Sequence, residues 1–535
     1  MDSLFDCVVP SIHEGSDRNS FSSVSRTCYD LDAKTRKHVT VHLCYATPFR
    51  CHQRFPFIKS LTLTGSPHIN VDLTSSPCNW DHNVTPWVQE IATSFKGLKS
   101  VSFQRLVVHD SDLELLAKTR GAKLSVLEID SCPGFSTDGL LFIGKYCNDL
   151  RILSLENSSI NEINGEWLHE LALHSTSIES LNFNNANLTK FDVKDLALVA
   201  KYCSHSLVSV KISDNYDFID LVEFFKNAVN LEYFGGGRFG NKPNYNHNHY
   251  HNALVMNRVA LQDKYKEFKF PPKLKSLALN PTGRTDILLP FAHLITQLVT
   301  TYLYYGEDHI NSFFNNCPNL EALYMPVIND KVLIHLSKFC KNLRKLYMIN
   351  KLGYSCTEDG LFALAQGCQK LECLHISLSS ITDDTMSYVG TQMKNLSDLS
   401  MVLVNNGVKW KKNQVLDNGV RTLLMGCTKL ERFSIQFQKL GGLSDGGLEN
   451  IGKFGCNLRY LCLGYVGKSD AGLMELSYGC PKLQELVVKD CPFSMEAFDI
   501  FRCRVTSLRY FEFPGIPRHC RYLLEQDQQL FTQIV

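Results

Sequence analysis

The sequence predicts an α/β fold, a leucine-rich-repeat solenoid with parallel strands inside and helices outside, preceded by a small helical module. Three observations support this prediction: a length of 535 residues, a leucine pattern that returns along most of the chain, and an N-terminal segment that does not follow this pattern. A chain of this length is too long for one compact core, so several domains or one elongated repeat array are expected.

The repeated pattern is N-L-x-x-L-x-L, followed by a variable stretch and an apolar helical segment that ends in Cys or a small residue. Examples are DLRILSLEN, SIESLNFNN, NLEALYMPV, NLRKLYMIN, KLECLHISL, NLRYLCLGY and KLQELVVKD. About sixteen copies fit, roughly 23–34 residues apart, with an irregular stretch at about 235–271. Since one strand and one helix cannot bury their apolar faces alone, the units must stack. The pattern predicts a solenoid over residues 46–535 after a helical module over 1–45.

Composition limits the classes of function that are compatible with the chain. Hydrophobic residues make up 44% and charged residues 20%, the balance of an ordinary folded protein. The net charge of +1 gives no overall field that would favour nucleic acid or an anionic membrane as a partner. The N-terminus shows neither a secretory signal nor a membrane span, so a soluble, intracellular protein is expected.

The 20 cysteines contain no C-x-x-C pair, and most stand at one recurring place just before a new repeat. These are Cys147, Cys203, Cys317, Cys340, Cys368, Cys427 and Cys480. Cysteines placed by a repeat are typical of small buried core residues rather than metal ligands or disulfides. His247, His249 and His251 alternate in an Asn-rich stretch and could bind zinc, but such loops also collect histidines without a role. No metal site is predicted.

The helical half of each unit has a start signal of its own. STDGL, TEDGL, SDGGL and SDAGL each begin with Ser or Thr, carry an acid within two residues and continue into an apolar segment. The hydroxyl caps the helix and the acid complements the positive helix end. GLSDG also matches the G-x-S-x-G nucleophile pattern, but the sibling motifs indicate that Ser444 is a cap. An enzyme is not predicted.

Strand alternation predicts which side chains line the concave face, because the leucines point into the core and the residues between them point outward. The predicted concave residues include tyrosines on adjacent repeats: Tyr302, Tyr304, Tyr324 and Tyr347. Clustered tyrosines are common anchors at protein interfaces, so a partner-binding patch is predicted. A tyrosine patch that only packs sideways is the alternative.

The N-terminal segment has apolar residues at helical spacing, in LFDCVVPSI and then in FSSVSRTCYDLDAKTRKHV. Ahead of a repeat array, this order of apolar helix, D-R and S-x-V-S-x-x-C-aromatic resembles an F-box. The resemblance implies docking of a Skp-type adaptor through apolar contacts. The candidate adaptor-binding residues are Leu4, Val8, Val9, Pro10, Ile12, Phe21, Val24 and Cys28. A role in capping the solenoid is the alternative for the same residues.

A wider resemblance runs from residue 1 to about 515. The segments that carry it are DAKTRKHVTVHLCYATP, RFPFIKSLTLTG, VTPWVQEI, WLHELALHSTSIESLNF, LDNGVRTLLMGC and LGYVGKSDAGLMELSYGCP. They resemble the coronatine-insensitive F-box proteins of plants, which are jasmonate co-receptors. The resemblance implies a non-catalytic substrate receptor of an SCF-type ubiquitin ligase, with a cullin ligase and a JAZ-type repressor as partners, located in nucleus and cytoplasm.

The same resemblance implies jasmonoyl-isoleucine and an inositol polyphosphate as ligands. The family positions that hold the hormone and the repressor peptide correspond to His68, Met325, Ser377, Ser400, Gln436, Lys489 and Glu512. A buried carboxylate needs charge-assisted donors, and one lysine plus a mostly neutral histidine replaces several arginines here. Our hypothesis is therefore a ligase subunit that has lost or changed its small-molecule ligand. A repeat scaffold without any ligase is the alternative.

Overall fold

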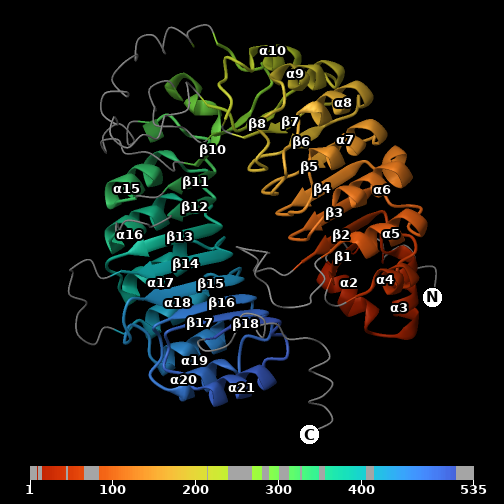
Figure 1. Cartoon of the computed structure of the whole chain (residues 1–535). Helices are drawn as coiled ribbons and strands as arrows, with labels where there is room; N and C mark the ends of the chain where they lie inside the picture. The colour runs from red at the N-terminus through yellow and green to blue at the C-terminus, as the bar shows by residue number, and fades with distance from the viewer. Residues whose placement is uncertain are drawn as a thin grey trace. The chain divides into compact units, whose positions relative to one another are not determined.

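The structure is a computed structural model, and it describes residues 9, 12, 15–43, 46–65, 83–213, 215–238, 265, 268–279, 288–299, 313–325, 328–348, 356–404 and 415–513. The chain divides into two compact units, Met1–Lys275 and Ser276–Val535. In each unit strands and helices alternate along the chain (Figure 1). Among the described residues, no helix is long and apolar enough to cross a membrane.

Unit 1 begins with two helices and continues into a parallel sheet in which consecutive strands pair. Its strands are β1 (His38–His42), β2 (Ser60–Thr64), β3 (Ser100–Gln104), β4 (Val126–Asp130), β5 (Ile152–Ser154), β6 (Ser180–Asn182), β7 (Ser209–Lys211) and β8 (Tyr233–Gly235). Its helices are α2 (Gly15–Ser22), α3 (Arg26–Thr35), α4 (Pro48–Arg54), α5 (Thr85–Thr93), α6 (Asp110–Arg120), η3 (Gly121–Lys123), α7 (Thr137–Tyr146), α8 (Glu166–His174), α9 (Val193–Tyr202) and α10 (Val222–Asn227).

Unit 2 repeats the arrangement, again with parallel pairing of consecutive strands. Its strands are β9 (Ser276–Leu279), β10 (Ile295–Val299), β11 (Ala322–Met325), β12 (Lys345–Met348), β13 (Cys373–Leu378), β14 (Asp398–Leu403), β15 (Arg432–Phe437), β16 (Tyr460–Gly464), β17 (Glu485–Lys489) and β18 (Tyr510–Glu512). Its helices are η4 (Leu289–Leu294), α15 (Asp330–Phe339), α16 (Glu358–Gly367), α17 (Asp383–Gln392), α18 (Asp417–Gly426), α19 (Asp445–Phe454), α20 (Asp470–Leu476) and α21 (Met495–Arg504).

The leucine positions of the repeat form the core between sheet and helices. Leu61 and Leu63 of β2 and Leu461 and Leu463 of β16 are fully buried, because each strand turns every second residue toward the helix layer. The other sheet face, opposite the helices, carries the alternate residues and is called the open face below. The predicted leucine-rich-repeat fold is confirmed in both units.

Five of the seven recurring cysteines are C-cap residues of described helices. Cys147, Cys340 and Cys368 are the C-cap residues of α7, α15 and α16, and each is buried. Burial raises the pKa of the Cys147 and Cys368 thiols to about 12, since the thiolate would lose its hydration. These cysteines therefore act as small apolar residues of the repeat core.

The helix starts hold neighbouring repeats together. Ser444 accepts a hydrogen bond from the backbone N of Gly446 at 3.2 Å, so it is the N-cap of α19. Its own backbone N donates to Asp417 Oδ1 at 2.9 Å, and its Oγ donates to Asp417 Oδ2. Asp417 is the first residue of α18, one repeat earlier. The acid at a helix start thus binds the capping residue of the next helix, a role that the sequence pattern did not indicate.

Candidate functional site

The open face of unit 2 carries three rows of side chains, because its strands pair in register and every second residue points to the same side. The first row contains Lys345, Cys373, Asp398, Arg432, Tyr460, Glu485 and Tyr510. The second row is Tyr324, Tyr347, His375, Ser400, Ser434, Cys462, Val487 and Glu512. The third row is Ser377, Val402, Gln436, Gly464 and Lys489.

An aromatic ladder opens the second row. The rings of Tyr324 and Tyr347 are stacked, with centroids 4.5 Å apart and an interplanar angle of 5°. The edge of Tyr347 meets the ring of His375 at 4.8 Å and 72°. Burial raises the pKa of Tyr347, with a further contribution from the neighbouring Cys373 thiol. The ladder is a preformed, half-buried aromatic surface. Tyr302 and Tyr304, the other two predicted members, lie outside the described residues.

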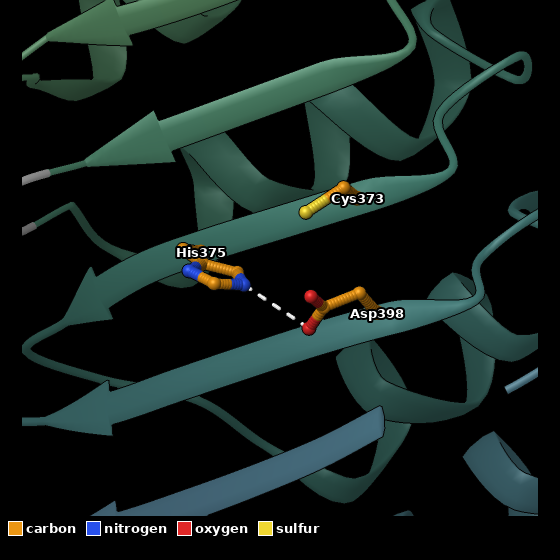
Figure 2. A group of neighbouring side chains, drawn as sticks. All are labelled: Cys373, His375 and Asp398. Carbon is orange, nitrogen blue, oxygen red and sulfur yellow. Dashed lines mark hydrogen bonds and ion pairs between the residues drawn. The ribbon is translucent and has the colours of Figure 1, made fainter. Parts of the chain in front are cut away.

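His375 links the ladder to the first row. Its Nε2 lies 3.0 Å from Asp398 Oδ1, and Cys373 lies beside both (Figure 2). Burial alone would lower the pKa of His375, but the interactions with Asp398 and Cys373 outweigh it and raise the pKa to about 9. A pKa of about 9 leaves His375 positively charged at neutral pH, and the carboxylate of Asp398 balances this charge.

Arg432 is held by acids and an aromatic ring. Its Nε lies 3.7 Å from Asp398 Oδ2, and its Nη1 lies 4.0 Å from Glu485 Oε2. The guanidinium also lies 3.9 Å from the centroid of the Tyr460 ring, a favourable cation–π geometry. The positive charge of Arg432 is thus already balanced within the protein.

The structure brings together five of the residues that correspond to the family ligand pocket. Ser400 and Glu512 lie in the second row, and Ser377, Gln436 and Lys489 lie in the third. Lys489 is exposed, whereas Ser377 is buried. Both Lys489 and Glu512 act on the pKa of Cys462, in opposite directions, so a negative and a positive charge share this part of the face.

Of the other two pocket candidates, Met325 is not on this face and His68 lies outside the described residues. Met325 is only 3% exposed and alternates with Tyr324, so it points into the core of unit 2. A pocket role for Met325 is therefore corrected, since a one-residue shift along a strand moves a side chain to the opposite face. His247, His249 and His251 also lie outside the described residues.

Part of the open face is itself a small apolar core. Cys462, Val487 and Tyr510 are each at most 5% exposed and pack together, with Tyr460 against them. Strand alternation accounts for the direction of Cys462 and Val487, which point away from the leucine core. It did not predict that side chains on adjacent strands, less than about 5 Å apart, would cover one another.

The open face of unit 1 is polar, and acids outnumber lysines among its charged side chains. Glu156 accepts hydrogen bonds from Lys211 Nζ and, at 2.9 Å, from Asn182 Nδ2. Burial, with the charge of Glu156 added, raises the pKa of Tyr233 to about 12. Glu128 and Asp130 lie on β4, one repeat before Glu156. Glu156 therefore balances the charge of Lys211. Among the described strand residues of unit 1, the open face carries no cluster of lysines or arginines.

Among the adaptor candidates that the structure describes, one apolar residue is strongly exposed. Val24 is 73% exposed at the end of α2, whereas Phe21, Cys28 and Ile12 are half-buried. Val9 is 1% exposed and supports the module from within, because its carbonyl accepts a hydrogen bond from Arg18 Nη1 at 2.5 Å. Val9 is therefore corrected from an adaptor-binding candidate to a buried residue of the module. Leu4, Val8 and Pro10 lie outside the described residues.

A buried carboxylate joins this module to the first helix of the repeats. Asp32 of α3 is fully buried, and its Oδ1 lies 3.0 Å from Arg18 Nε and 3.0 Å from Arg36 Nε. Its Oδ2 lies 3.4 Å from Nη2 of Arg54, the last residue of α4. The Arg54 guanidinium also covers the ring of Tyr29 at 3.0 Å. Asp32 thus fixes α3 against α4.

A parallel sheet built from strand–helix repeats, preceded by this helical module, defines an F-box leucine-rich-repeat protein. An F-box family profile matches residues 1–38. The chain is 42% identical to coronatine-insensitive protein 1 of Arabidopsis thaliana over 523 residues, covering 95% of this chain and 85% of the relative. It is 37% identical to coronatine-insensitive protein homolog 1a of Oryza sativa subsp. indica, covering 95% and 84%. GRR1-like protein 1 of Arabidopsis thaliana is 30% identical, covering 95% and 85%.

The chain belongs to the coronatine-insensitive family of F-box leucine-rich-repeat proteins. The resemblance that its sequence motifs indicated is confirmed. It is a divergent member, because the positions on the open face that correspond to the family ligand pocket carry small, polar or acidic side chains and one lysine.

Proposed function

We propose that the protein is the substrate-recognition subunit of an SCF-type ubiquitin ligase. The observation that carries this proposal is the direct attachment of an F-box module to a repeat array through Asp32 and Arg54. A rigid joint of this kind holds a bound target at a fixed position relative to the adaptor. The protein would then contribute proximity rather than bond chemistry, by raising the effective concentration of target lysines near the ligase.

The F-box would bind a Skp-type adaptor and through it a cullin ligase. Val24 suits this role, because it is an apolar side chain that is 73% exposed on the module. Burying a residue of this size at an interface contributes about 1.5–3 kcal/mol. From the resemblance to plant F-box proteins, we place this protein in the nucleus and the cytoplasm. A fluorescent fusion in plant cells tests the location.

The target would be a protein segment bound on the open face of unit 2. The stacked pair Tyr324 and Tyr347 supplies rigid aromatic area, and Ser400 and Gln436 supply polar groups next to it. Tyrosine-rich surfaces bind peptides well because they lose little side-chain entropy. By family, the target is a JAZ-type transcriptional repressor. Neither nucleic acid nor a membrane is proposed as a partner.

The described residues do not fit the hormone of the family. A buried carboxylate ligand such as that of jasmonoyl-isoleucine needs several charge-assisted donors. Lys489 is the one cation among the described pocket positions, Glu512 adds a negative charge, and Arg432 already faces Asp398 and Glu485. We therefore propose that the target binds without jasmonoyl-isoleucine, or with a different small molecule.

An inositol polyphosphate does not fit the described open face of unit 1 either. Its several negative charges require a cluster of lysines or arginines. Lys211 is bound by Glu156, and Glu128 and Asp130 add further negative charge. We assign no role to this ligand in the function of the chain.

Co-purification with a Skp-type adaptor tests the ligase proposal. Val24→Asp should abolish stable binding without unfolding the protein, because Val24 is mostly exposed. Val208→Asp is the matched control, since Val208 is 39% exposed near β7, far along unit 1, and binding should survive. If the unaltered chain does not bind the adaptor, the alternative of a free-standing repeat scaffold replaces the proposal.

A titration with jasmonoyl-isoleucine and a repressor degron peptide tests the altered pocket. We expect neither the hormone nor the peptide to bind with a sub-micromolar Kd, whether each is added alone or both are added together. Sub-micromolar affinity that depends on the hormone would show that the pocket has kept its function despite the substitutions. Tyr347→Ala should weaken any peptide that does bind, whereas Phe362→Ala, on the outer helix α16, should not.

A further inference from the structure

One group of side chains on the open face of unit 2 has metal-ligand chemistry. Cys373 and His375 lie on β13, and Asp398 lies opposite Cys373 on β14. One possible ligand atom from each residue lies within 4.8 Å of the others. Figure 2 shows the thiol, the imidazole and the carboxylate directed toward one common point.

We propose that Cys373, His375 and Asp398 bind a zinc ion. A thiolate, an imidazole and a carboxylate are the three ligand types that zinc takes in proteins, whereas calcium and magnesium prefer oxygen ligands alone. Three protein ligands leave the fourth tetrahedral position to water. The proposal does not rest on the proposed ligase function, although His375 also contacts Tyr347 of the proposed target surface.

The present distances require only small side-chain movements. Zinc bonds of about 2.0–2.3 Å in a tetrahedron separate neighbouring ligand atoms by about 3.3–3.8 Å. His375 Nε2 and Asp398 Oδ1 are 3.0 Å apart, and all three atoms are within 4.8 Å. The backbone positions are set by six paired residues between β13 and β14. Rotation of side chains on a fixed sheet therefore suffices to form the site.

The surroundings suit a bound ion. Arg432 lies beside Asp398 Oδ2 at 3.7 Å, which leaves Oδ1 on the side of His375. Such an outer contact orients a ligating carboxylate. Zinc displaces the protons of Cys373 and His375, because its ligands must be deprotonated, and the resulting thiolate and the carboxylate together balance the two charges of zinc. Asp398 and His375 are partly exposed, at 26% and 36% of their side chains, so an ion can enter from the open face.

The sequence could not reveal this site. Its ligands come from two repeats, and their alignment depends on the register of β13 with β14. Cys373 also differs from the repeat cysteines: it begins a strand, whereas Cys340 and Cys368 end helices. A purely structural role for the three residues, as a cross-strand hydrogen-bonded pair beside a small thiol, is the competing explanation.

Metal titration of the full-length protein decides between a zinc site and a purely structural role for the three residues. The protein is stripped with a chelator and titrated with ZnCl2 in competition with a zinc-binding dye, and in parallel with CoCl2. We expect one site of highest affinity, and with cobalt the absorption bands of tetrahedral coordination and of thiolate-to-cobalt charge transfer. Cys373→Ser should remove the charge-transfer band.

Matched variants separate this site from other cysteines and histidines. Cys373→Ser, His375→Gln and Asp398→Asn should each weaken the tightest site at least about 10-fold. Cys456→Ser, at an exposed cysteine, and His335→Gln, at a half-buried histidine of α15, should leave it unchanged. A triple variant combines Cys373→Ser, His375→Gln and Asp398→Asn. If it binds zinc as the unaltered chain does, the site is refuted and the metal is adventitious. A cobalt complex of the unaltered chain without the thiolate band would refute the site in the same way.

Discussion

Asp470 accepts two hydrogen bonds from Ser494, the capping residue of the next helix. The backbone N of Ser494 donates to Oδ1 at 2.7 Å, and its Oγ donates to Oδ2 at 2.7 Å. The same arrangement joins Asp110 to Ser136 and Asp330 to Thr357. One carboxylate thus fixes the start of the next helix, so the repeats are linked by polar contacts as well as by the leucine core.

Asp470→Ala should destabilise the last repeats. The change removes two hydrogen bonds to a charged acceptor and leaves the Ser494 N–H without its partner, so we expect a loss of about 2–4 kcal/mol in the free energy of unfolding. Denaturant unfolding gives the loss, and hydrogen exchange should place it in α21. Asp138→Ala is the control, because Asp138 is an exposed acid in the first turn of α7. Its loss should be about 0.3–1 kcal/mol, and equal losses for the two variants would contradict the linking role.

Alanine replacements of the two adjacent glycines in SDGGL should differ in their effect on the stability of the protein. A Cβ on Gly447 would lie 2.5 Å from Asp417 Oδ1, whereas a Cβ on Gly446 would have no atom closer than 3.5 Å. Gly447→Ala should cost about 1–3 kcal/mol through overpacking, while Gly446→Ala should be neutral or stabilise α19 by up to about 1 kcal/mol. Thermal and denaturant unfolding of both variants test this.

A double-mutant cycle identifies the cause of the Gly447 effect. If the clash is with Asp417, then Gly447→Ala should cost less in a chain that already carries Asp417→Ala, because the obstructing carboxylate is gone. Additive costs would assign the effect to Leu443, whose side chain also lies against Gly447.

Local patterns in the sequence were sufficient for the strands, the buried leucines and the caps. Leu61 and Leu461 follow from alternation, and Ser444 follows from its sibling motifs, because each depends on residues close in the chain. Pairing across repeats was not predictable in this way. Asp417 with Ser444 depends on how one repeat stacks on the next, and so does Cys373 with Asp398. The length of each intervening loop sets that stacking, and no residue pattern encodes it.

The sequence also did not show which single apolar side chains are buried. Val9 and Met325 have the residue types expected for docking or pocket positions, yet both are buried. Apolar residues of a thin helical module serve its core and its surface alike, and the pattern does not separate the two. For Met325, a shift of one position along β11 decides between core and open face. The stack of Tyr324 on Tyr347 was easier to predict from the sequence, because the two residues occupy the same place in adjacent repeats.

Asp32→Ala should unfold or loosen the N-terminal module. It would leave Arg18, Arg36 and Arg54 without the carboxylate that all three face, and breaking a buried ion pair costs about 3–5 kcal/mol. Hydrogen exchange should increase in α3 and α4, and adaptor binding should fall with it. Asp30→Ala is the control, because Asp30 forms an exposed pair with Arg26 at 3.7 Å, worth at most about 1 kcal/mol. Unchanged exchange in Asp32→Ala would mean that apolar contacts alone hold the module.

The cysteines should divide into two classes by their reactivity toward iodoacetamide. Burial raises the pKa of Cys147, Cys368 and Cys480 to about 12, so at pH 8 only about one thiol in 10,000 is the reactive thiolate. Cys456 and Cys503 are exposed and should react at the rate of an ordinary thiol. Because the raised pKa shifts thiolate formation to higher pH, the buried class should stay unmodified up to pH 9 unless the protein unfolds.

Peptide mass spectrometry after brief labelling measures the two classes directly. In the native protein, Cys456 and Cys503 should be alkylated at least about 100-fold faster than Cys147, Cys368 and Cys480. In guanidinium chloride the difference should vanish, because unfolding restores hydration to every thiol. If Cys147 and Cys368 reacted as fast as Cys456 in the native state, their place at the buried ends of α7 and α16 would be wrong, and with it the role of cysteine in the repeat.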